Sequence, residues 1–430
     1  MRSTETGPII VVGAGVIGLS TALHLREAMP ERPIVVIEAG AVGDGTTPAG
    51  AGFVAPWATV LPHLGPAGLA LAEHSLDLYR ALAASGVELR FRGNGNIVLF
   101  NHQDSMDATV GAVMANPVRS EVTRVINAGE VSELTSGAVD AARVVGGIFM
   151  PGGIQLETGL LLAHLARLAV EAGIEIRPHT EVAALRTADG RIEGVELRLA
   201  ADESPVSLQS DVVVLAVGAW LNPLLEQVGW RLPLLPFVAT RFVTEDVGLA
   251  PTMPTIQAKD FPLWIRESEG GFTWGSTRGC APAHRLGGDW EAYQPARRRR
   301  DDLVAAMTAD IERVAGTFPA LSGARTTAVI QGMPVYTVDR QFFAGEVPGC
   351  VGLWAVGGDN ESGVSHGPGL GRLLADLITG SETPLCDATG YRLDRFAPTD
   401  FPDAEAVGQE FVRGAGGFIA EAMGQPFSSA

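Results

Sequence analysis

The stretch Val11–Ser20 reads VVGAGVIGLS, and its three glycines have the spacing G-x-G-x-x-G. The run that precedes them, Pro8–Val12, is apolar and rich in β-branched residues, which predicts a buried parallel strand. Apolar residues recur at helical spacing in Val16–Ala28, and Ile34–Ile37 has the composition of a second strand. Together these segments predict a βαβ unit of about 30 residues, the setting in which such glycines indicate a bound dinucleotide.

The glycines and one acidic residue each have a predicted role in this nucleotide site. Gly13 would allow the tight turn after the strand, Gly15 the approach of a pyrophosphate, and Gly18 the close packing of helix on sheet. Glu38 ends the second strand, so its carboxylate would accept hydrogen bonds from ribose hydroxyls and repel a 2′-phosphate. The alternative, a turn whose glycines serve packing alone, fits this context less well. The predicted contacts to the dinucleotide also include Val16, Ile17 and Ala39.

Composition restricts the class of protein. The 430 residues carry a formal net charge of -18, and 46% of them are hydrophobic. This length suits two or three domains with packed cores, and the acidic surface argues against nucleic acid as a partner. The three cysteines are widely spaced, so no metal site is predicted. Reduced thiols, no recognisable signal peptide and no long apolar run together predict a cytoplasmic protein.

Alternating strand and helix patterns appear three times, near residues 8–60, 155–220 and 330–380. Strong helices are predicted at 66–84 and 157–172. The segments between the three regions are mostly β, which indicates a nucleotide domain interrupted by a second domain. Because an NAD-binding domain is normally one continuous block, the interruption favours a flavin nucleotide.

Four further segments carry a resemblance to a known family. Gly43–Ala58 (GDGTTPAGAGFVAPWA) supplies small residues and two threonines, and Val182 lies in HTEVAAL. Leu215–Trp220 (LAVGAW) and Val356–Ile378 (VGGDNESGVSHGPGLGRLLADLI) follow. From residue 8 to about 396 the chain resembles the FAD-dependent D-amino acid oxidase / glycine oxidase / sarcosine oxidase superfamily. The resemblance is strong at the FAD elements and weak in the predicted substrate domain.

The resemblance implies an α/β fold with a Rossmann-like, glutathione-reductase-like FAD-binding domain that is interleaved with a mostly antiparallel β substrate domain. The expected boundaries are 1–85, 148–222 and 330–397 for the FAD-binding domain, 86–147 and 223–329 for the substrate-binding domain, and 398–430 for a C-terminal extension.

The resemblance also implies which segments contact FAD. The residues after Glu38 would wrap the ribityl-pyrophosphate and line the flavin, and the loop before the last helix would cover the flavin edge. Six glycines between Gly357 and Gly371 are expected to leave room for a planar ligand, and Pro368 suits the first turn of a helix. The positive N-terminus of that helix would stabilise the anionic reduced flavin. The further expected FAD contacts are Thr46, Thr47, Ala51, Gly52, Val182, Ala216, Gly218, Trp220, Gly332, Gly358, Asn360, Glu361, Ser362, Gly363, Val364 and Ser365.

The chain departs from the family pattern at four positions. Gly332 begins the stretch GMPVYTVD, where sarcosine-oxidase relatives have the cysteine that binds FAD covalently, so non-covalent FAD is expected. Pro334 stands where amino-acid-oxidising relatives place an arginine for the substrate carboxylate. Ser365 replaces a lysine of some relatives, and Lys259, the only lysine, precedes the strand FPLWIRE instead of following it. These departures argue against a simple α-amino acid as substrate and favour an electron acceptor other than O2.

The reaction implied by the resemblance is oxidation of a C–N bond, in which a neutral amine delivers hydride to flavin N5 and the product imine is hydrolysed. The candidate catalytic residues are Arg266, Ser365, His366 and Tyr336, with Arg241 as a second arginine. A surface ion pair is the alternative role for the arginines, and a structural role at the helix start is the alternative for His366. The candidate aromatic pocket walls, for which core packing is an equal alternative, are Trp57, Trp264, Trp274 and Tyr336.

Two other functions compete with an FAD-dependent amine or amino-acid oxidoreductase. One is a non-catalytic FAD-binding subunit of a larger dehydrogenase complex, which fits the loss of the carboxylate-binding arginine. The other is an NAD-dependent dehydrogenase, which would be colourless. The expected partners are a small amine or amino-acid-like substrate and an electron acceptor, either O2 or another carrier. The sequence does not identify the substrate, and it leaves a homo-oligomer open.

Overall fold

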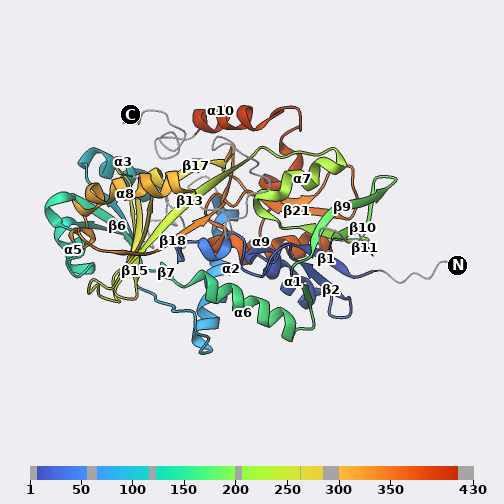
Figure 1. Cartoon of the computed structure of the whole chain (residues 1–430), viewed down its shortest axis with the longest axis horizontal. Coiled ribbons are helices and arrows are strands. Elements are labelled where there is room, and N and C mark those ends of the chain that lie inside the picture. Colours follow the sequence, from blue (N-terminus) through green and yellow to red (C-terminus); the bar gives the residue numbers. More distant parts are fainter. Residues whose placement is uncertain are drawn as a thin grey trace.

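The computed structural model describes residues 7–55, 65–115, 123–198, 206–261, 263–283 and 300–414. The molecule has two lobes that lie side by side along its longest axis (Figure 1). The lobe near the N-terminus contains a parallel sheet, and the other lobe contains a larger, mostly antiparallel sheet. The predicted pocket-wall residue Trp57 lies outside the described residues.

A six-stranded sheet forms the centre of the first lobe, in the order β20-β21-β12-β1-β2-β8. All neighbouring strands are parallel except β20 and β21. The central strand β1 has neighbours on both sides and is buried along its whole length, as its apolar sequence predicts. The predicted βαβ unit is confirmed. The strands are β1 (Ile9–Val12), β2 (Ile34–Ile37), β8 (Glu175–Arg177), β12 (Val213–Leu215), β20 (Phe343–Glu346) and β21 (Leu353–Gly357).

Four helices contribute to the core of this lobe: α1 (Val16–Ala28), α2 (Gly65–Ala84), α6 (Thr158–Glu171) and α9 (Gly363–Thr379). Helix α9 packs closely on both α1 and α2. A Cβ atom on Gly371 would lie 2.6 Å from the backbone nitrogen of Thr21, and one on Gly369 would lie 2.3 Å from the carbonyl oxygen of Leu71. These two glycines therefore serve helix packing, and the expectation that they leave room for a planar ligand is wrong.

The start of α9 also differs from expectation. The helix begins at Gly363, so Pro368 lies in its second turn and not in its first. Proline has no N–H group to donate to the carbonyl of Val364, four residues earlier. Tyr79 of α2 donates its hydroxyl to that carbonyl at 2.7 Å. A residue from another helix thus supplies the hydrogen bond that proline withholds, and the helix continues through it.

The second lobe is built on a ten-stranded sheet whose main path is β17-β13-β16-β15-β14-β4-β6-β5, with β18 and β19 also paired to β13. Its strand pairs are antiparallel except for β4 with β14. This arrangement confirms the expected fold class. The strands are β4 (Asn96–Phe100), β5 (Arg124–Asn127), β6 (Gly146–Met150), β13 (Leu234–Thr244), β14 (Thr255–Ala258), β15 (Leu263–Ser268), β16 (Gly271–Ser276), β17 (Cys280–Pro282), β18 (Thr326–Gly332) and β19 (Val335–Thr337). The helices of this lobe are α3 (Gln103–Met114), α5 (Ala128–Leu134) and α8 (Asp301–Ala315).

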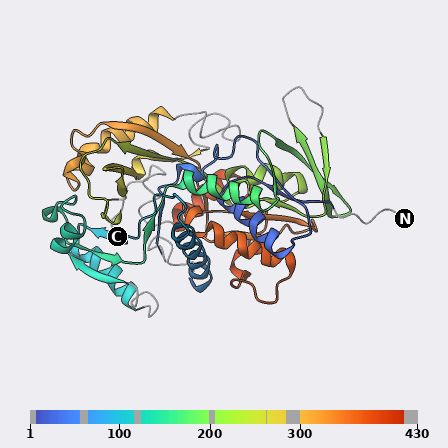
Figure 2. The same cartoon turned by 90° about the horizontal axis from the view of Figure 1, so that it is seen from below.

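Smaller elements complete the chain. A three-stranded antiparallel sheet stands at the end of the molecule that carries the N-terminus (Figure 2). Helix α10 packs its residues Val407 and Phe411 against Phe237 and Tyr336 of the large sheet. None of the helices in the described ranges combines the length and the apolarity that a membrane span needs. The remaining elements are β3 (Phe53–Val54), which pairs with β7 (Ile154–Gln155), β9 (Glu181–Ala188), β10 (Arg191–Arg198), β11 (Val206–Gln209), α7 (Leu221–Leu225) and α10 (Ala404–Gly414).

The predicted domain boundaries at 148 and 330 fall inside strands. Residue 148 lies in β6 and residue 330 lies in β18, and both strands belong to the ten-stranded sheet. The sheet of the second lobe therefore includes residues 148–150, beyond the first predicted boundary, and β18 and β19 around the second. Sequence patterns predict roughly where the chain passes from the α/β domain to the mostly β domain. Strand pairing, which local sequence does not encode, determines to which sheet each boundary strand belongs.

Candidate functional site

The three glycines at the start of α1 do not all have the same surroundings. Gly13 has a φ of +100°, and a Cβ there would lie 2.5 Å from the carbonyl oxygen of Ala216. A Cβ on Gly18 would lie 2.0 Å from the carbonyl oxygen of Gly13. On Gly15 it would meet only the Thr47 hydroxyl, at 3.4 Å. Packing thus requires glycine at 13 and 18, whereas Gly15 borders open space at the N-terminus of α1.

Two side chains hold this turn in place. The Glu38 carboxylate accepts hydrogen bonds from the backbone nitrogens of Ala14 at 2.9 Å and Gly40 at 3.0 Å. The hydroxyl of Thr47 accepts one from the nitrogen of Val16 at 3.2 Å. The first N–H groups of a helix lack partners within the helix and carry a partial positive charge. The N-terminus of α1 therefore carries the partial positive charge that favours an anion, and the N–H group of its first residue, Val16, is already bonded to Thr47.

A second open glycine lies on the neighbouring strand. Gly218 follows β12 with a φ of +56°, and no atom lies within 4 Å of the Cβ it would carry. Because β1 and β12 are parallel neighbours, their carboxyl ends meet at the same edge of the sheet. Three other residues with expected FAD contacts are also described. Ala216 donates its backbone N–H to the carbonyl of Val12 at 2.9 Å. Val182 is buried in β9, and Trp220 is half-buried. Room for an extended phosphate-bearing ligand exists where α/β sheets bind nucleotides.

A third segment, the loop 358–362 before α9, is fixed to strand β19. Asn360 donates its backbone N–H to Val335 at 2.9 Å, and its side-chain oxygen accepts from the nitrogen of Thr337 at 3.0 Å. Asp359 accepts from the nitrogen of Val335 at 3.2 Å. Asn360 and Glu361 have positive φ values of 48° and 63°, which non-glycine residues adopt only when their surroundings impose it. The loop thus has one defined shape.

The segment 46–52 joins these parts. Thr46 accepts a hydrogen bond from the backbone nitrogen of Met333 at 3.0 Å. A Cβ on Gly332 would lie 2.8 Å from that of Ala49, and one on Gly50 would lie 3.6 Å from Val364. Gly367 of α9 in turn lies against Val16, whose side chain a Cβ would meet at 3.0 Å. Segments from the beginning and the end of the sequence thus converge on one place, as the expected FAD contacts require.

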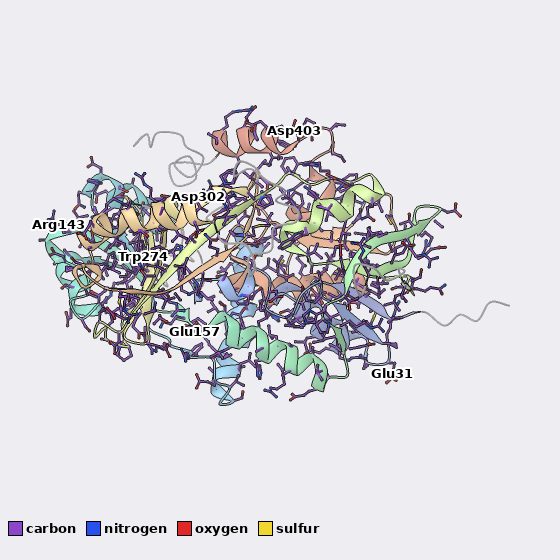
Figure 3. All side chains as sticks on the ribbon, viewed as in Figure 1. Glu31, Arg143, Glu157, Trp274, Asp302 and Asp403 are labelled. Atoms are coloured by element: carbon purple, nitrogen blue, oxygen red, sulfur yellow. The ribbon has the colours of Figure 1, made fainter. Side chains whose placement is uncertain are left out.

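The two candidate arginines both bind the backbone of this segment. Arg266 donates to the carbonyl of Ala51 at 2.6 Å, to that of Glu267 at 2.9 Å and to the Glu157 carboxylate at 2.7 Å. Glu157 lies at the start of α6, between the lobes (Figure 3). Arg241 donates to the carbonyls of Ala49 at 2.9 Å and Pro48 at 3.3 Å, and to the hydroxyl of Thr273 at 2.9 Å.

These contacts define what the arginines do in the structure. Arg266 is 3% exposed and Arg241 is 6% exposed, and each guanidinium nitrogen already donates to a protein oxygen. Burial, and then the nearby charge of Arg266, lowers the pKa of Arg241 to about 10. The geometry favours a positioning role, in which both side chains hold residues 48–51, over the expected contact with substrate.

Tyr336 and His366 have different surroundings. Tyr336 of β19 is buried, and burial, followed by the nearby negative charge of Glu361, raises the pKa of its hydroxyl well above the usual value. His366 is 2% exposed, its ring lies 5.0 Å from that of Phe342, and its Nδ1 is 3.3 Å from the carbonyl oxygen of Ser362. Burial lowers the pKa of His366 to about 4. The helix-start structural role expected as the alternative for His366 agrees with this position, and Ser365 beside it is half-buried.

The remaining aromatic candidates divide between core and boundary. Trp274 is buried in the second lobe, in edge-to-face contact with Phe242 (Figure 3). It is therefore a core residue, and its expected place in a pocket wall is wrong. Trp264 is half-buried, packs over Gly275 and lies 6.1 Å from the ring of Phe53.

Sequence reasoning missed two features of this site. The bond from Tyr79 to Val364 and the pairing of Glu157 with Arg266 join residues far apart in the sequence. Each of these residues occupies an ordinary helix or strand position in the local sequence, so no sequence pattern predicted its contact with a distant residue.

Comparison with known proteins gives consistent results. The sequence model of a family described as "FAD dependent oxidoreductase" (DAO) matches residues 8–377. The chain is 28% identical to glycine oxidase of Pseudomonas putida over 403 residues, which cover 89% of this chain and 97% of that protein. It is 25% identical to 4-methylaminobutanoate oxidase (formaldehyde-forming) of Paenarthrobacter nicotinovorans, over 90% of this chain but only 45% of the relative. The crystal structure of glycine oxidase from Geobacillus kaustophilus superposes with a TM-score of 0.75 at 25% identity, over 91% of this chain and 99% of that one.

Proposed function

The chain belongs to the DAO family of FAD-dependent oxidoreductases, and from this premise we propose that it oxidises the C–N bond of an amine or amino acid to an imine. FAD, when bound, supplies the acceptor for a hydride from the carbon next to nitrogen, and water then hydrolyses the imine. The observation that carries the proposal is the convergence of residues 13–18, 46–52, 332–333 and 358–364 around one open edge of the parallel sheet.

The residues at that edge fit FAD. The open positions at Gly15 and Gly218 leave space for a pyrophosphate at the N-terminus of α1, and the Glu38 carboxylate stands where a ribose would be bound. The residues that would hold the cofactor are those expected from the sequence: Gly13, Gly15, Val16, Ile17, Gly18, Glu38, Ala39, Thr46, Thr47, Ala51, Gly52, Val182, Ala216, Gly218, Trp220, Gly332, Gly358, Asn360, Glu361, Ser362, Gly363, Val364 and Ser365.

The cofactor is held without a covalent bond. Gly332 offers no nucleophile at the position where some relatives have a cysteine. Burial, followed by the nearby negative charge of Glu361, raises the pKa of the Cys280 thiol. A protonated thiol is a poor nucleophile. Denaturation should therefore release all yellow colour from the polypeptide, and colour that stays with the chain would contradict non-covalent binding.

The chain's own groups orient the substrate and move few protons. Arg241 and Arg266 hold residues 48–51 in place through hydrogen bonds to their backbone. Tyr336 of β19 and the nearby Glu361 are two further polar residues at the site. Ser365 and His366 complete the set of candidate residues, with His366 acting on the shape of the helix start. The electron acceptor is O2 or another carrier, and the position of Lys259, the only lysine, exposed next to β14, favours a carrier other than O2.

Anaerobic mixing of the purified protein with a panel of amines and amino acids tests this function. A substrate should bleach the oxidised flavin band near about 450 nm. Re-oxidation by a quinone or a ferricenium salt should then be faster than re-oxidation by air. A protein that holds FAD and is bleached by no amine would instead fit a non-catalytic subunit, and a colourless protein would contradict the cofactor.

A further inference from the structure

Two histidines meet where α1 and α2 face each other. The Nε2 atoms of His24 in α1 and His74 in α2 lie 3.2 Å apart. Their ring centres are 5.1 Å apart and the ring planes are tilted by 54°, so the rings meet through their nitrogen edges and do not stack. Both side chains are half-buried and keep some contact with solvent, so a small ion can reach the two nitrogens.

The carboxylate of Glu27 determines which nitrogen of His24 carries the proton. The Nδ1 atom of His24 lies 3.2 Å from this exposed carboxylate, and an ionised carboxylate only accepts hydrogen bonds. Nδ1 is therefore the donor, and Nε2 presents its lone pair towards His74. Histidines that bind metal ions have this surrounding, in which a carboxylate orients one nitrogen while the other nitrogen binds the ion.

The separation of the two Nε2 atoms fits a shared metal ion. Bonds from Zn²⁺ to imidazole are about 2.0–2.1 Å long, so two such bonds that span 3.2 Å meet at about 100–105°, close to the tetrahedral angle. Within the described ranges, no group of three or more His, Cys, Asp and Glu residues is arranged to hold a metal ion. Water would therefore complete the coordination, and the ion would be exchangeable, unlike one in a closed structural site.

The charges near the pair favour a cation. Glu27 of α1, Asp77 of α2 and Asp376 of α9 each favour a positive charge on one or both of the two rings. Arg372 of α9 opposes it, but its Nε donates a hydrogen bond to Asp376 at 2.8 Å. Paired imidazoles in such surroundings are the kind of ligand that suits Zn²⁺, Cu²⁺ and Ni²⁺.

From this geometry we propose that His24 and His74 together bind one divalent transition-metal ion such as Zn²⁺, and that Glu27 orients His24 for it. The ion joins α1 to α2 and thereby stabilises the packing of the helix whose N-terminus borders the cofactor segments. His24 lies about two turns along α1 from that end, so the metal site is separate from the proposed oxidation site. The inference stands whether or not the chain oxidises amines.

Calorimetric titration of the FAD-loaded, metal-free protein with zinc chloride tests the site. The wild type should bind Zn²⁺ with micromolar affinity. His24→Gln and His74→Gln should each weaken this binding about 100-fold, and Glu27→Gln should weaken it about tenfold, because loss of an orienting partner costs less than loss of a ligand. Glu31→Gln and His102→Gln change exposed groups outside the pair and should leave the affinity unchanged (Figure 3).

Two further measurements report on the same ion. One equivalent of Cu²⁺ should show nitrogen coupling from two imidazoles in its electron paramagnetic resonance spectrum, and Zn²⁺ should raise the melting temperature of the wild type but not that of His74→Gln. If a histidine variant does not fold, the wild-type Cu²⁺ spectrum and the exposed Glu27→Gln change decide. Equal Zn²⁺ affinity in wild type and His74→Gln, or binding at millimolar concentration only, would overturn the inference and leave a hydrogen-bonded pair of rings.

Discussion

The hydroxyl of Tyr79 donates a 2.7 Å hydrogen bond to the carbonyl oxygen of Val364, the group that Pro368 leaves without its usual partner in α9. The bond crosses from α2 to α9 and is buried at its tyrosine end. It explains how a helix that borders the cofactor segments tolerates a proline in its second turn.

Tyr79→Phe should therefore destabilise the protein by about 1–3 kcal/mol, because the Val364 carbonyl would be left unsatisfied. Urea unfolding of the purified variant measures this loss. Tyr391→Phe is a matched control, since its buried hydroxyl has no hydrogen-bond partner among the described residues. Equal losses in the two variants would show that removal of a buried hydroxyl, and not the bond to Val364, is the relevant contribution.

Substitutions at Gly15 and Gly18 should distinguish an effect on FAD binding from an effect on stability. Gly18→Ala places a methyl group 2.0 Å from the carbonyl oxygen of Gly13 and should cost about 1–3 kcal/mol of stability through overpacking. Gly15→Ala meets only Thr47 at 3.4 Å, so the apoprotein should keep its stability. Its FAD affinity should nevertheless fall about tenfold or more. FAD titration of the apoprotein, with thermal melting alongside, checks both; a Gly15→Ala variant that binds FAD normally would argue against the pyrophosphate at this position.

Arg266→Lys should lower FAD affinity more than it changes the substrate concentration for half-maximal bleaching. A lysine cannot replace the three separately directed bonds to Ala51, Glu267 and Glu157. The expected loss of FAD affinity is about tenfold, equivalent to one charged hydrogen bond. Arg325→Lys, which alters an exposed pair with Glu245, is the control. The opposite pattern, with FAD affinity intact and substrate binding lost, would restore Arg266 to the substrate site.

Stability should fall on the acid side through the buried histidines. His366 has a pKa of about 4 when folded against an ordinary value of 6.5, so the unfolded chain takes up a proton that the folded chain refuses. Its contribution is fully present above pH 6.5 and is lost as the pH falls towards 4, by about 3 kcal/mol in all. Burial also lowers the pKa of His24 and His74, whose Nε2 atoms lie 3.2 Å apart.

Urea unfolding of the apoprotein at pH 7.5, 6.0 and 4.5 measures this dependence. His366→Gln should flatten it, whereas His102→Gln, which changes an exposed ring, should not. Identical slopes for wild type and His366→Gln would assign the acid sensitivity to other groups.

Sequence and structure agree where local pattern alone determines the result. The βαβ unit, the helices near 66–84 and 157–172 and the interrupted α/β organisation all follow from periodicity and turn chemistry. Disagreement begins where distant residues decide. The start of α9 depends on Tyr79, the purpose of Gly369 and Gly371 depends on α1 and α2, and the direction of Arg266 depends on Ala51 and Glu157. No periodicity within one segment encodes such partners.

The parallel pairing of β4 with β14 has a consequence for synthesis. Strand β4 ends at Phe100, and its parallel neighbour β14 begins only at Thr255. Likewise, β1 cannot pair with β12, and α1 cannot pack on α9, until those later segments have been synthesised. A nascent chain leaving the ribosome must therefore carry incomplete sheet edges until its last third has emerged. Such edges invite aggregation, so slower translation or chaperone capacity should limit the yield of folded enzyme more than the stability of the finished protein does.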